Sequence, residues 1–335
     1  MTLITAAGIL VDGVMRPRLG LRLGPAGRIQ SVAPLTTFVG GPDVDLGPRL
    51  LLPGAVDGYL PAPTKPAAAD LAWVESLRAP LQARLQRGIT CVAVWLPVAI
   101  DQRPLVALLA LGQRLRLRLS LVLTIDLGPA ARLPFEVACA AFEAAVGQIA
   151  GRRDACASWA LGVQALLASL PLDACIALKL RFAHLPLLLR LVAAAGDAAL
   201  PSPIPLLCRR GVADASTAFL DPTDLGELEA RALASAGSLV GWSGALQANR
   251  GAVNFLRAHG VPQFIGAAGP AELGPGSSAA AGRALGIDLA GFRPGQWADL
   301  VSVPLAGSGP PSDVVQDVFV AGRPCRRDGQ PQLLN

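Results

Sequence analysis

The chain has 335 residues, which is enough for one large domain and a small satellite. Hydrophobic residues make up 52% of it and charged residues only 16%, against the roughly 25% that is typical of soluble domains. The net charge of +5 is spread along the chain, and the short arginine runs carry no interleaved aromatic residues. This pattern argues against nucleic-acid binding. Gly, Ser and Gln interrupt the uncharged runs, so no membrane helix is predicted.

The cysteines and the first residues bear on location. The six cysteines are dispersed and include no Cys-x-x-Cys pair. We predict reduced core cysteines of a cytoplasmic protein and no cysteine metal site. The apolar run Leu3–Val11 has no preceding basic region and ends at the turn Asp12-Gly13, so no targeting segment is predicted.

The two ends of the chain share one pattern and the middle has another. Near both termini, short apolar runs alternate with turn residues, which is typical of a β-meander. In between, apolar runs alternate with Ala- and Leu-rich helical stretches, as in parallel βα units. We therefore predict that residues 1–50 and 299–335 form a composite β-sandwich domain and that residues 51–298 form a TIM-type (βα) barrel.

The predicted barrel elements follow each other in the expected alternation. One helix is predicted to be missing, because only about fifteen residues separate Cys208 from Asp224, too few for a strand and a crossover helix. The gap would leave apolar surface exposed. Strands are predicted at Leu51–Val56, Thr90–Leu96, Leu117–Ile125, Trp159–Val163, Pro203–Cys208, Ser238–Gly241 and Gln263–Gly266. Helices are predicted near Pro66–Arg87, Arg103–Leu115, Pro134–Gly151, Leu172–Ala195, Asp224–Ala236, Ala245–His259 and Ser277–Leu285.

The most specific motif lies at Leu50–Pro61. Its apolar run and the segment Pro53–Asp57 resemble the first barrel strand of the amidohydrolase superfamily, where Pro-Gly-x-Val-Asp leads into His-x-His. Two later segments, Ala281–Gly286 and Gly291–Leu300, resemble the closing pattern of the same superfamily. The resemblance implies a (βα) barrel with a small β-domain built from both termini.

A narrower resemblance covers Leu225–Gly251. This segment, with Gln247 and Asn249 near its end, is similar to the formimidoylglutamate deiminase branch of the superfamily. Members of that branch hold one metal ion through His-x-His on strand one, histidines on strands five and six, and an aspartate on strand eight. The metal ion lowers the pKa of a bound water, which then attacks the substrate.

The resemblance implies a different residue at each of these ligand positions. It places Tyr59 and Pro61 at the His-x-His pair, Asp221 at the strand-six histidine and Ala268 at the aspartate. The predicted fifth strand, Pro203–Cys208, contains no histidine, and the chain has only two, both in predicted helices. We therefore expect no metal ion and no other cofactor.

Two carboxylates remain as catalytic candidates. Asp57, at the end of the first predicted strand, would most simply hydrogen-bond a neighbouring loop. Paired with Asp221, it would instead form a carboxylate dyad for a metal-free hydrolase or deaminase, if the pKa values of the two groups were split.

Five polar residues are candidates for ligand binding: Tyr59, Arg209, Arg210, Gln247 and Asn249. Two arginines at a strand end would grip a carboxylate or phosphate, or would pair with nearby aspartates. The amides would line a pocket or cap a helix. Together these residues predict a small-molecule sensor with a small carboxylate ligand as one alternative.

The leading hypothesis from the sequence is a non-catalytic amidohydrolase-like protein. It would act as a scaffold or regulatory subunit through contacts with a protein partner or with a second copy of itself. The hypothesis depends on the missing histidines and on the apolar surface expected where a helix is absent.

Overall fold

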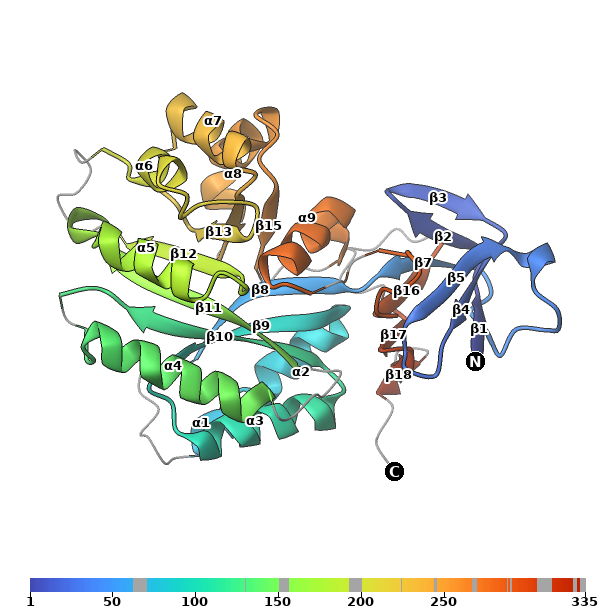
Figure 1. The fold of residues 1–335 in the computed structure, drawn as a ribbon. Coiled ribbons are helices and arrows are strands. Elements are labelled where there is room, and N and C mark those ends of the chain that lie inside the picture. Colours follow the sequence, from blue (N-terminus) through green and yellow to red (C-terminus); the bar gives the residue numbers. More distant parts are fainter. Residues whose placement is uncertain are drawn as a thin grey trace.

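The computed structural model describes residues 1–62, 71–129, 131–150, 157–192, 201–223, 225–243, 246–266, 270–287, 289, 291–305, 315–327 and 330–331. A parallel barrel and a two-sheet β-domain lie side by side in the molecule (Figure 1). The predicted fold class, a TIM-type barrel with a small β-domain from both termini, is confirmed.

Eight parallel strands form the barrel, in the same order in space as in the sequence. Most are continuous apolar runs because both faces of each strand are buried, one against the barrel interior and one against the helices. The strands are β8 (Ala55–Pro61), β9 (Ile89–Pro97), β10 (Arg118–Asp126), β11 (Ala157–Leu166), β12 (Leu187–Val192), β13 (Thr217–Leu220), β14 (Leu239–Trp242) and β15 (Gln263–Ile265).

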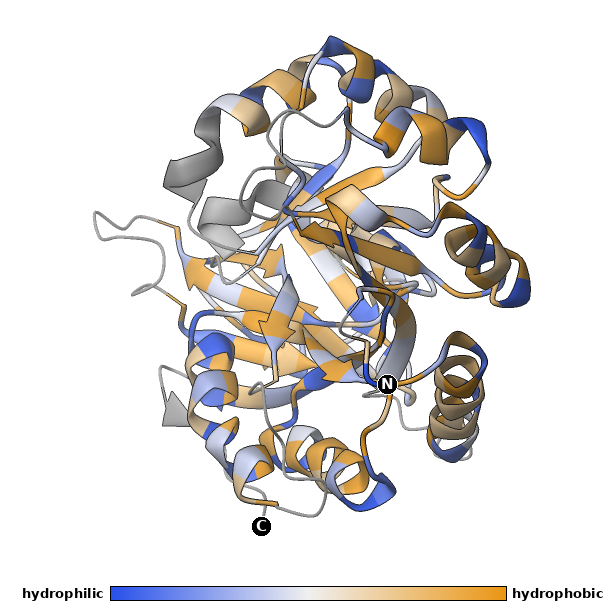
Figure 2. Cartoon of the chain, turned by 90° about the vertical axis from the view of Figure 1, so that its left-hand side faces the viewer, coloured by the Kyte–Doolittle hydropathy of each residue, from blue (hydrophilic) through white to orange (hydrophobic). Residues whose placement is uncertain are grey.

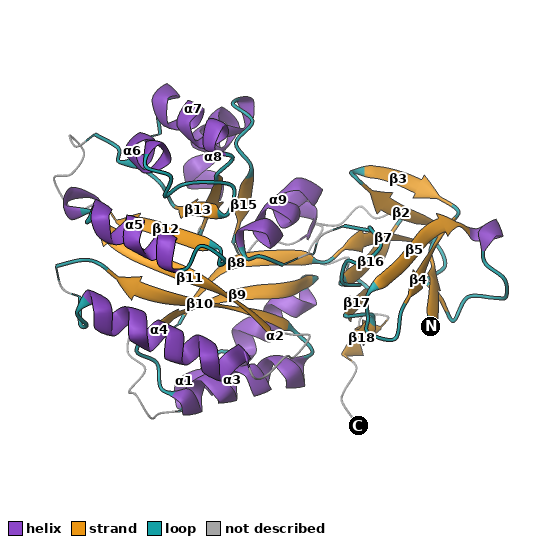
Figure 3. Cartoon of the chain, in the orientation of Figure 1, coloured by secondary structure: helices purple, strands orange, loops and turns teal. Residues whose placement is uncertain are grey.

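Helices follow all eight of these strands and surround the barrel (Figure 3). The prediction that one helix is missing is therefore wrong. The helices are α1 (Ala72–Ser76), α2 (Arg78–Gln86), α3 (Gln102–Leu115), α4 (Phe135–Ala150), α5 (Leu172–Arg181), α6 (Ile204–Arg209), α7 (Glu227–Ala236), α8 (Leu246–Ala258) and α9 (Pro270–Ala284), with the short 3-10 turns η1 (Leu35–Thr37) and η2 (Leu167–Ser169).

The error arose at the fifth βα unit. The segment predicted as one helix, Leu172–Ala195, contains α5 and then β12, with Pro186 between them. The segment predicted as the fifth strand, Pro203–Cys208, is instead helix α6. Its prolines occupy the first turn, where the missing backbone N–H has no helical partner to lose.

The β-domain contains a four-stranded sheet, β5-β4-β1-β6, and a seven-stranded sheet, β19-β18-β17-β16-β7-β2-β3. The second sheet joins the two termini, because β7 pairs with β16 in antiparallel register. Its strands and those of the first sheet are β1 (Thr2–Thr5), β2 (Gly8–Val11), β3 (Val14–Pro17), β4 (Leu19–Leu23), β5 (Ile29–Pro34), β6 (Val44–Asp45), β7 (Arg49–Pro53), β16 (Leu300–Pro304), β17 (Asp317–Val320), β18 (Arg323–Arg327) and β19 (Gln330–Pro331). The predicted strand Leu51–Val56 is divided at Gly54, so its first half belongs to this sheet and its second half to the barrel.

Apolar side chains fill three regions: the layer between barrel and helices, the barrel interior, and the space within the β-domain. Figure 2 shows that the strands are mostly apolar and that the surrounding helices carry both apolar and polar residues. The five described cysteines carry free thiols, and Cys156 lies outside the described residues. Among the described residues, no helix is both long and apolar enough to cross a membrane.

A phenylalanine fills the centre of the barrel. Phe264 is fully buried, and its ring lies against Gly58 on β8 and Gly241 on β14. A Cβ atom at either glycine would come within 2.4 Å of the ring. These glycines therefore let the ring close the barrel where β15 and β8 meet.

A buried ion pair joins the barrel to the β-domain. Arg118, at the start of β10, donates from Nε and Nη2 to the two carboxylate oxygens of Asp299, at 3.1 and 2.9 Å. Both residues are 2% exposed. The guanidinium groups of Arg118 and Arg28 both contact the Trp297 ring, at 4.4 and 4.0 Å from its centroid.

Candidate functional site

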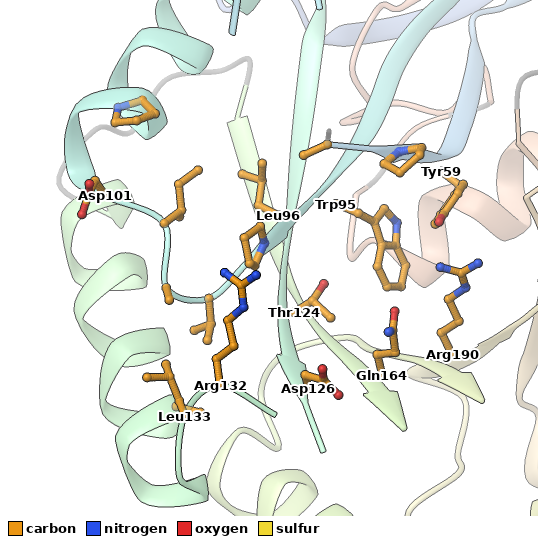
Figure 4. Close-up of a pocket in the computed structure, with 18 residues that line it drawn as sticks. Tyr59, Trp95, Leu96, Asp101, Thr124, Asp126, Arg132, Leu133, Gln164 and Arg190 are labelled. Atoms are coloured by element: carbon orange, nitrogen blue, oxygen red, sulfur yellow. The ribbon is translucent and has the colours of Figure 1, made fainter. Parts of the chain in front are cut away.

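A hollow of about 470 Å³ opens at the carboxyl ends of the barrel strands. In Figure 4, Tyr59, Trp95, Gln164 and Arg190 lie at one end, Arg132, Leu133 and Asp101 lie at the other, and Thr124 and Asp126 lie between them. This edge of a (βα) barrel is where active sites are found. The lining residues are Tyr59, Pro61, Ala62, Trp95, Leu96, Pro97, Val98, Ala99, Ile100, Asp101, Pro104, Thr124, Asp126, Arg132, Leu133, Ala138, Gln164 and Arg190.

Two aromatic rings form one wall of the hollow. Tyr59 of β8 and Trp95 of β9 lie with ring centroids 5.4 Å apart at an interplanar angle of 56°. The pairing of β8 with β9 shifts between Asp57 and Leu60, and Tyr59 within this irregularity packs against the apolar side chains of the barrel interior. Trp95 is 7% exposed and its Nε1 donates to the Gly58 carbonyl oxygen at 3.3 Å, so the wall is fixed in place.

Arg190 of β12 is a cationic group beside this wall. Its guanidinium carbon lies 5.5 Å from the centroid of the Tyr59 ring. Within the described part of the chain, no carboxylate lies close enough to Arg190 to form an ion pair. Burial raises the pKa of Tyr59, Arg190 partly opposes this and Asp221 adds to it, so the phenol remains protonated at neutral pH.

Asp57 and Asp221, the predicted carboxylate pair, have separate partners. Asp57 is fully buried, accepts from Arg84 Nε of α2 at 2.6 Å and accepts from the Tyr59 backbone N–H at 3.0 Å. Asp221 follows β13 with φ of 47° and accepts from the backbone N–H of Ser243 at 2.7 Å and from its hydroxyl. No hydrogen bond between these two aspartates is found, and their action as a dyad stays a prediction.

The other predicted binding residues are only partly brought together. Tyr59 lines the hollow as expected. Arg209 and Arg210 end helix α6 instead of a strand, which places them away from the strand ends and corrects the prediction. Gln247 and Asn249 lie in the first turns of α8, after β14, and the structure describes their backbone but not their side chains. Their role in binding stays a prediction.

Sequence reasoning missed Arg190, Asp126 and Gln164. Arg190 was hidden because its strand was assigned to a helix, although Pro186 inside that helix marked a break. Asp126 and Gln164 lie one residue beyond the predicted ends of strands that were otherwise found. Polar residues that directly follow buried parallel strands were the available signal.

Comparison with solved structures finds similarity over the whole chain. A triazine hydrolase from Arthrobacter aurescens is 14% identical with a TM-score of 0.79, covering 100% of this chain and 97% of that chain. An amidohydrolase from Brucella melitensis is 16% identical with a TM-score of 0.76, covering 99% and 96%. A zinc-bound adenosine deaminase from Xanthomonas campestris is 17% identical with a TM-score of 0.72, covering 99% and 94%. No family model matches the sequence, and no curated protein matches it.

The fold raises the question of whether these strand ends suit a zinc ion. Tyr59 and Pro61 end β8, Arg190 lies near the end of β12, and Asp221 follows β13. A proline side chain has no donor and a guanidinium repels a cation, whereas zinc sites use His, Cys and carboxylate groups. Among the described residues, no three His, Cys, Asp or Glu side chains gather to hold a metal ion. The described side chains at these strand ends therefore do not fit a zinc ion, and Ala268, predicted at the place of the aspartate, lies outside the described residues.

The non-catalytic scaffold predicted from the sequence is contradicted by these comparisons. The similar structures are named as hydrolases and a deaminase, and nothing found in the comparisons favours a scaffold. The structural reason given for a scaffold also fails, because α6 covers the barrel where a helix was thought to be absent. The likeness spans the barrel and the terminal sheets alike, and it shows that this chain has the same fold as these solved structures.

Proposed function

We propose that the hollow at the barrel mouth binds a small organic carboxylate with a planar part. The observation that carries this proposal is Arg190, a cation that faces the hollow with no carboxylate partner among the described residues. A guanidinium presents a fork of N–H donors that matches a carboxylate in a bidentate geometry. A bound carboxylate would supply the missing counter-charge.

The aromatic wall supports a planar ligand. Tyr59 and Trp95 stand beside Arg190 and are tilted against each other, which leaves ring faces for a flat group to contact. The raised pKa of Tyr59 keeps its phenol neutral, so it does not neutralise the Arg190 charge as a phenolate would. Leu96, Ile100 and other apolar residues complete the lining, as is usual for small-molecule pockets.

The names of the similar structures agree with a planar ligand. Triazines and the adenine base of adenosine are flat, nitrogen-containing rings, and proteins with this fold are named for acting on triazines and on adenosine. The proposed carboxylate preference comes from Arg190, beside the aromatic wall, and the second arginine of the lining, Arg132, adds positive charge to the same hollow. The proposal therefore takes the planar shape of the ligand from the names of the similar structures and its negative charge from the arginines in this pocket.

Titration calorimetry with benzoate tests the proposal. Benzoate should bind the wild-type protein, and Arg190→Gln should weaken binding about 10- to 100-fold, from the roughly 1.5–3 kcal/mol of a hydrogen bond to a charged group. Arg190→Lys should keep part of the affinity because the charge remains. Arg209→Gln is the matched control, since Arg209 is exposed at the end of α6. Equal benzoate affinity in Arg190→Gln and wild type would contradict the proposal.

Hydrolysis of the bound carboxylate is a second candidate, favoured by two groups in the lining. Tyr59 is a neutral phenol that can donate a proton, and Asp126 is an exposed carboxylate that can accept one. In a C–N cleavage, Asp126 would take a proton from the attacking water and Tyr59 would give its proton to the leaving nitrogen. Product analysis by mass spectrometry on a panel of N-substituted aromatic carboxylates tests this. Turnover that survives in both Tyr59→Phe and Asp126→Asn would rule out these roles.

A further inference from the structure

Three polar residues of the hollow stand in one row across neighbouring strands. Asp126 of β10 is the register partner of Gln164 on β11, and Gln164 is the register partner of Arg190 on β12. Register partners on parallel strands point to the same face of the sheet, and all three side chains line the hollow. The row therefore runs from a negative group through a neutral amide to a positive group.

The spacing of the row keeps its charges apart. Two strand spacings separate Asp126 from Arg190, which is about 10 Å between their backbones. Gln164 stands between them, and no ion pair joins them. Asp126 accepts the backbone N–H of Gly128 at 2.8 Å through Oδ1, and no described residue donates to its Oδ2. Both ends of the row thus have capacity for a ligand.

The same level of the barrel is apolar on the next three strands. Register places Leu220 of β13 beside Arg190, then Gly241 of β14, then Phe264 of β15. Leu220 and Phe264 are buried in the barrel interior. Along the register from β10 to β15, the polar side chains at this level therefore come from β10, β11 and β12.

We propose that this row selects a dipolar ligand, which carries a carboxylate for Arg190 and an ammonium or other N–H donor for Asp126. Gln164 can donate to or accept from a polar group between the two ends. The inference depends on the carboxylate binding proposed above and adds the second charge and the orientation. A ligand with only a carboxylate places its aromatic ring, and no N–H donor, against Asp126. Such a ligand should therefore bind more weakly than a dipolar one.

Three aromatic probes separate the contributions. The probes are 4-(aminomethyl)benzoate, which carries both charges, 4-methylbenzoate, which carries only the carboxylate, and benzylamine, which carries only the ammonium. Their affinities are measured by titration calorimetry at pH 7 and low ionic strength. The dipolar probe should bind about tenfold tighter than 4-methylbenzoate, and benzylamine should bind most weakly.

Two substitutions then assign the ends of the row. Asp126→Asn should remove most of the tenfold preference and leave the affinity for 4-methylbenzoate unchanged or improved. Arg190→Gln should weaken both carboxylate probes. Glu136→Gln, an exposed acid on α4 outside the lining, serves as the charge-matched control and should change nothing. Thermal unfolding of each variant shows that it is folded.

The outcomes separate this inference from the proposed function. If neither carboxylate probe binds the wild-type protein, the proposed carboxylate site is wrong and the dipolar inference is wrong with it. If 4-methylbenzoate binds as tightly as the dipolar probe, the carboxylate site stands and the dipolar inference is overturned. A preference for the dipolar probe that persists in Asp126→Asn overturns the assignment of Asp126.

Discussion

Removing the charge of Asp299 should strongly destabilise the protein. Asp299 accepts two hydrogen bonds from Arg118, and its Oδ1 also accepts the backbone N–H of Ala321 at 2.9 Å. Asp299→Asn keeps the size of the side chain but leaves the Arg118 charge buried without its counter-ion. Breaking a buried ion pair in this way costs about 3–5 kcal/mol, because the remaining charge is kept from water. That is a large part of the roughly 5–15 kcal/mol that stabilises a typical domain.

Urea unfolding followed by tryptophan fluorescence and far-UV circular dichroism measures this loss. Trp297 stacks on Arg118 and contributes to the fluorescence together with the other four tryptophans of the chain. The double variant Arg118→Met with Asp299→Asn removes both charges and should be more stable than Asp299→Asn alone. Asp12→Asn is the control, since Asp12 pairs with Arg293 on the surface and should change stability by less than about 0.5 kcal/mol.

Two results would refute this reasoning about the pair. The first is a loss of less than about 1 kcal/mol in Asp299→Asn, which would mean that water or another group compensates Arg118. The second is a double variant whose loss equals the sum of the two single losses, which would mean that the residues do not interact. Either result would mean that the Arg118–Asp299 pair, although present in the structure, contributes little to the free energy of unfolding.

Two further predictions concern charged groups outside the hollow. Lys179 donates to Asp214 at 2.8 Å and is 10% exposed. Burial acts to raise the pKa of Asp214, but the hydrogen bond from Lys179 helps to hold it below its usual value. Lys179→Met should therefore lower the free energy of unfolding by about 1–2 kcal/mol at pH 7, and by progressively less as pH falls through the pKa of Asp214. Urea unfolding at several pH values measures this, and a loss of stability that does not change with pH would contradict it. The backbone carbonyl of Phe255 and then the Glu227 carboxylate raise the pKa of His259, so the stability that His259 adds should be complete at low pH and should fall as pH rises through its folded pKa. A stability difference between wild type and His259→Asn that is unchanged from about pH 5 to pH 8 would argue against this role.

The sequence predicted the fold well because several independent patterns agreed. The motif at Pro53–Asp57, the βα alternation and the similar β-meanders at the two ends all indicated a barrel with a composite β-domain. The fifth strand failed because a run of leucines is compatible with a buried strand or with a helix, and periodicity does not separate them. Leu187–Val192 is such a run: Pro186 marks a break before it, and its pairing with β11 and β13 makes it a strand.

The candidate site was harder to predict than the fold. Tyr59 was found because a motif marked its position, whereas Arg190 lay in the misassigned strand. The arginines chosen in its place, Arg209 and Arg210, came from a helix that was mistaken for that strand. The row that joins Asp126 to Arg190 depends on strand register, which a single sequence does not specify between strands that are separated by helices.

The pairing of β7 with β16 has a consequence for how the chain folds during synthesis. One edge of β7 is completed only by residues 300–304, so it stays open until all eight barrel strands have been synthesised. The ion pair of Arg118 also forms late, because Asp299 lies 181 residues after Arg118 in the sequence. A nascent chain therefore carries an unpaired sheet edge while the whole barrel is made, and until β16 is available that edge can pair with other chains.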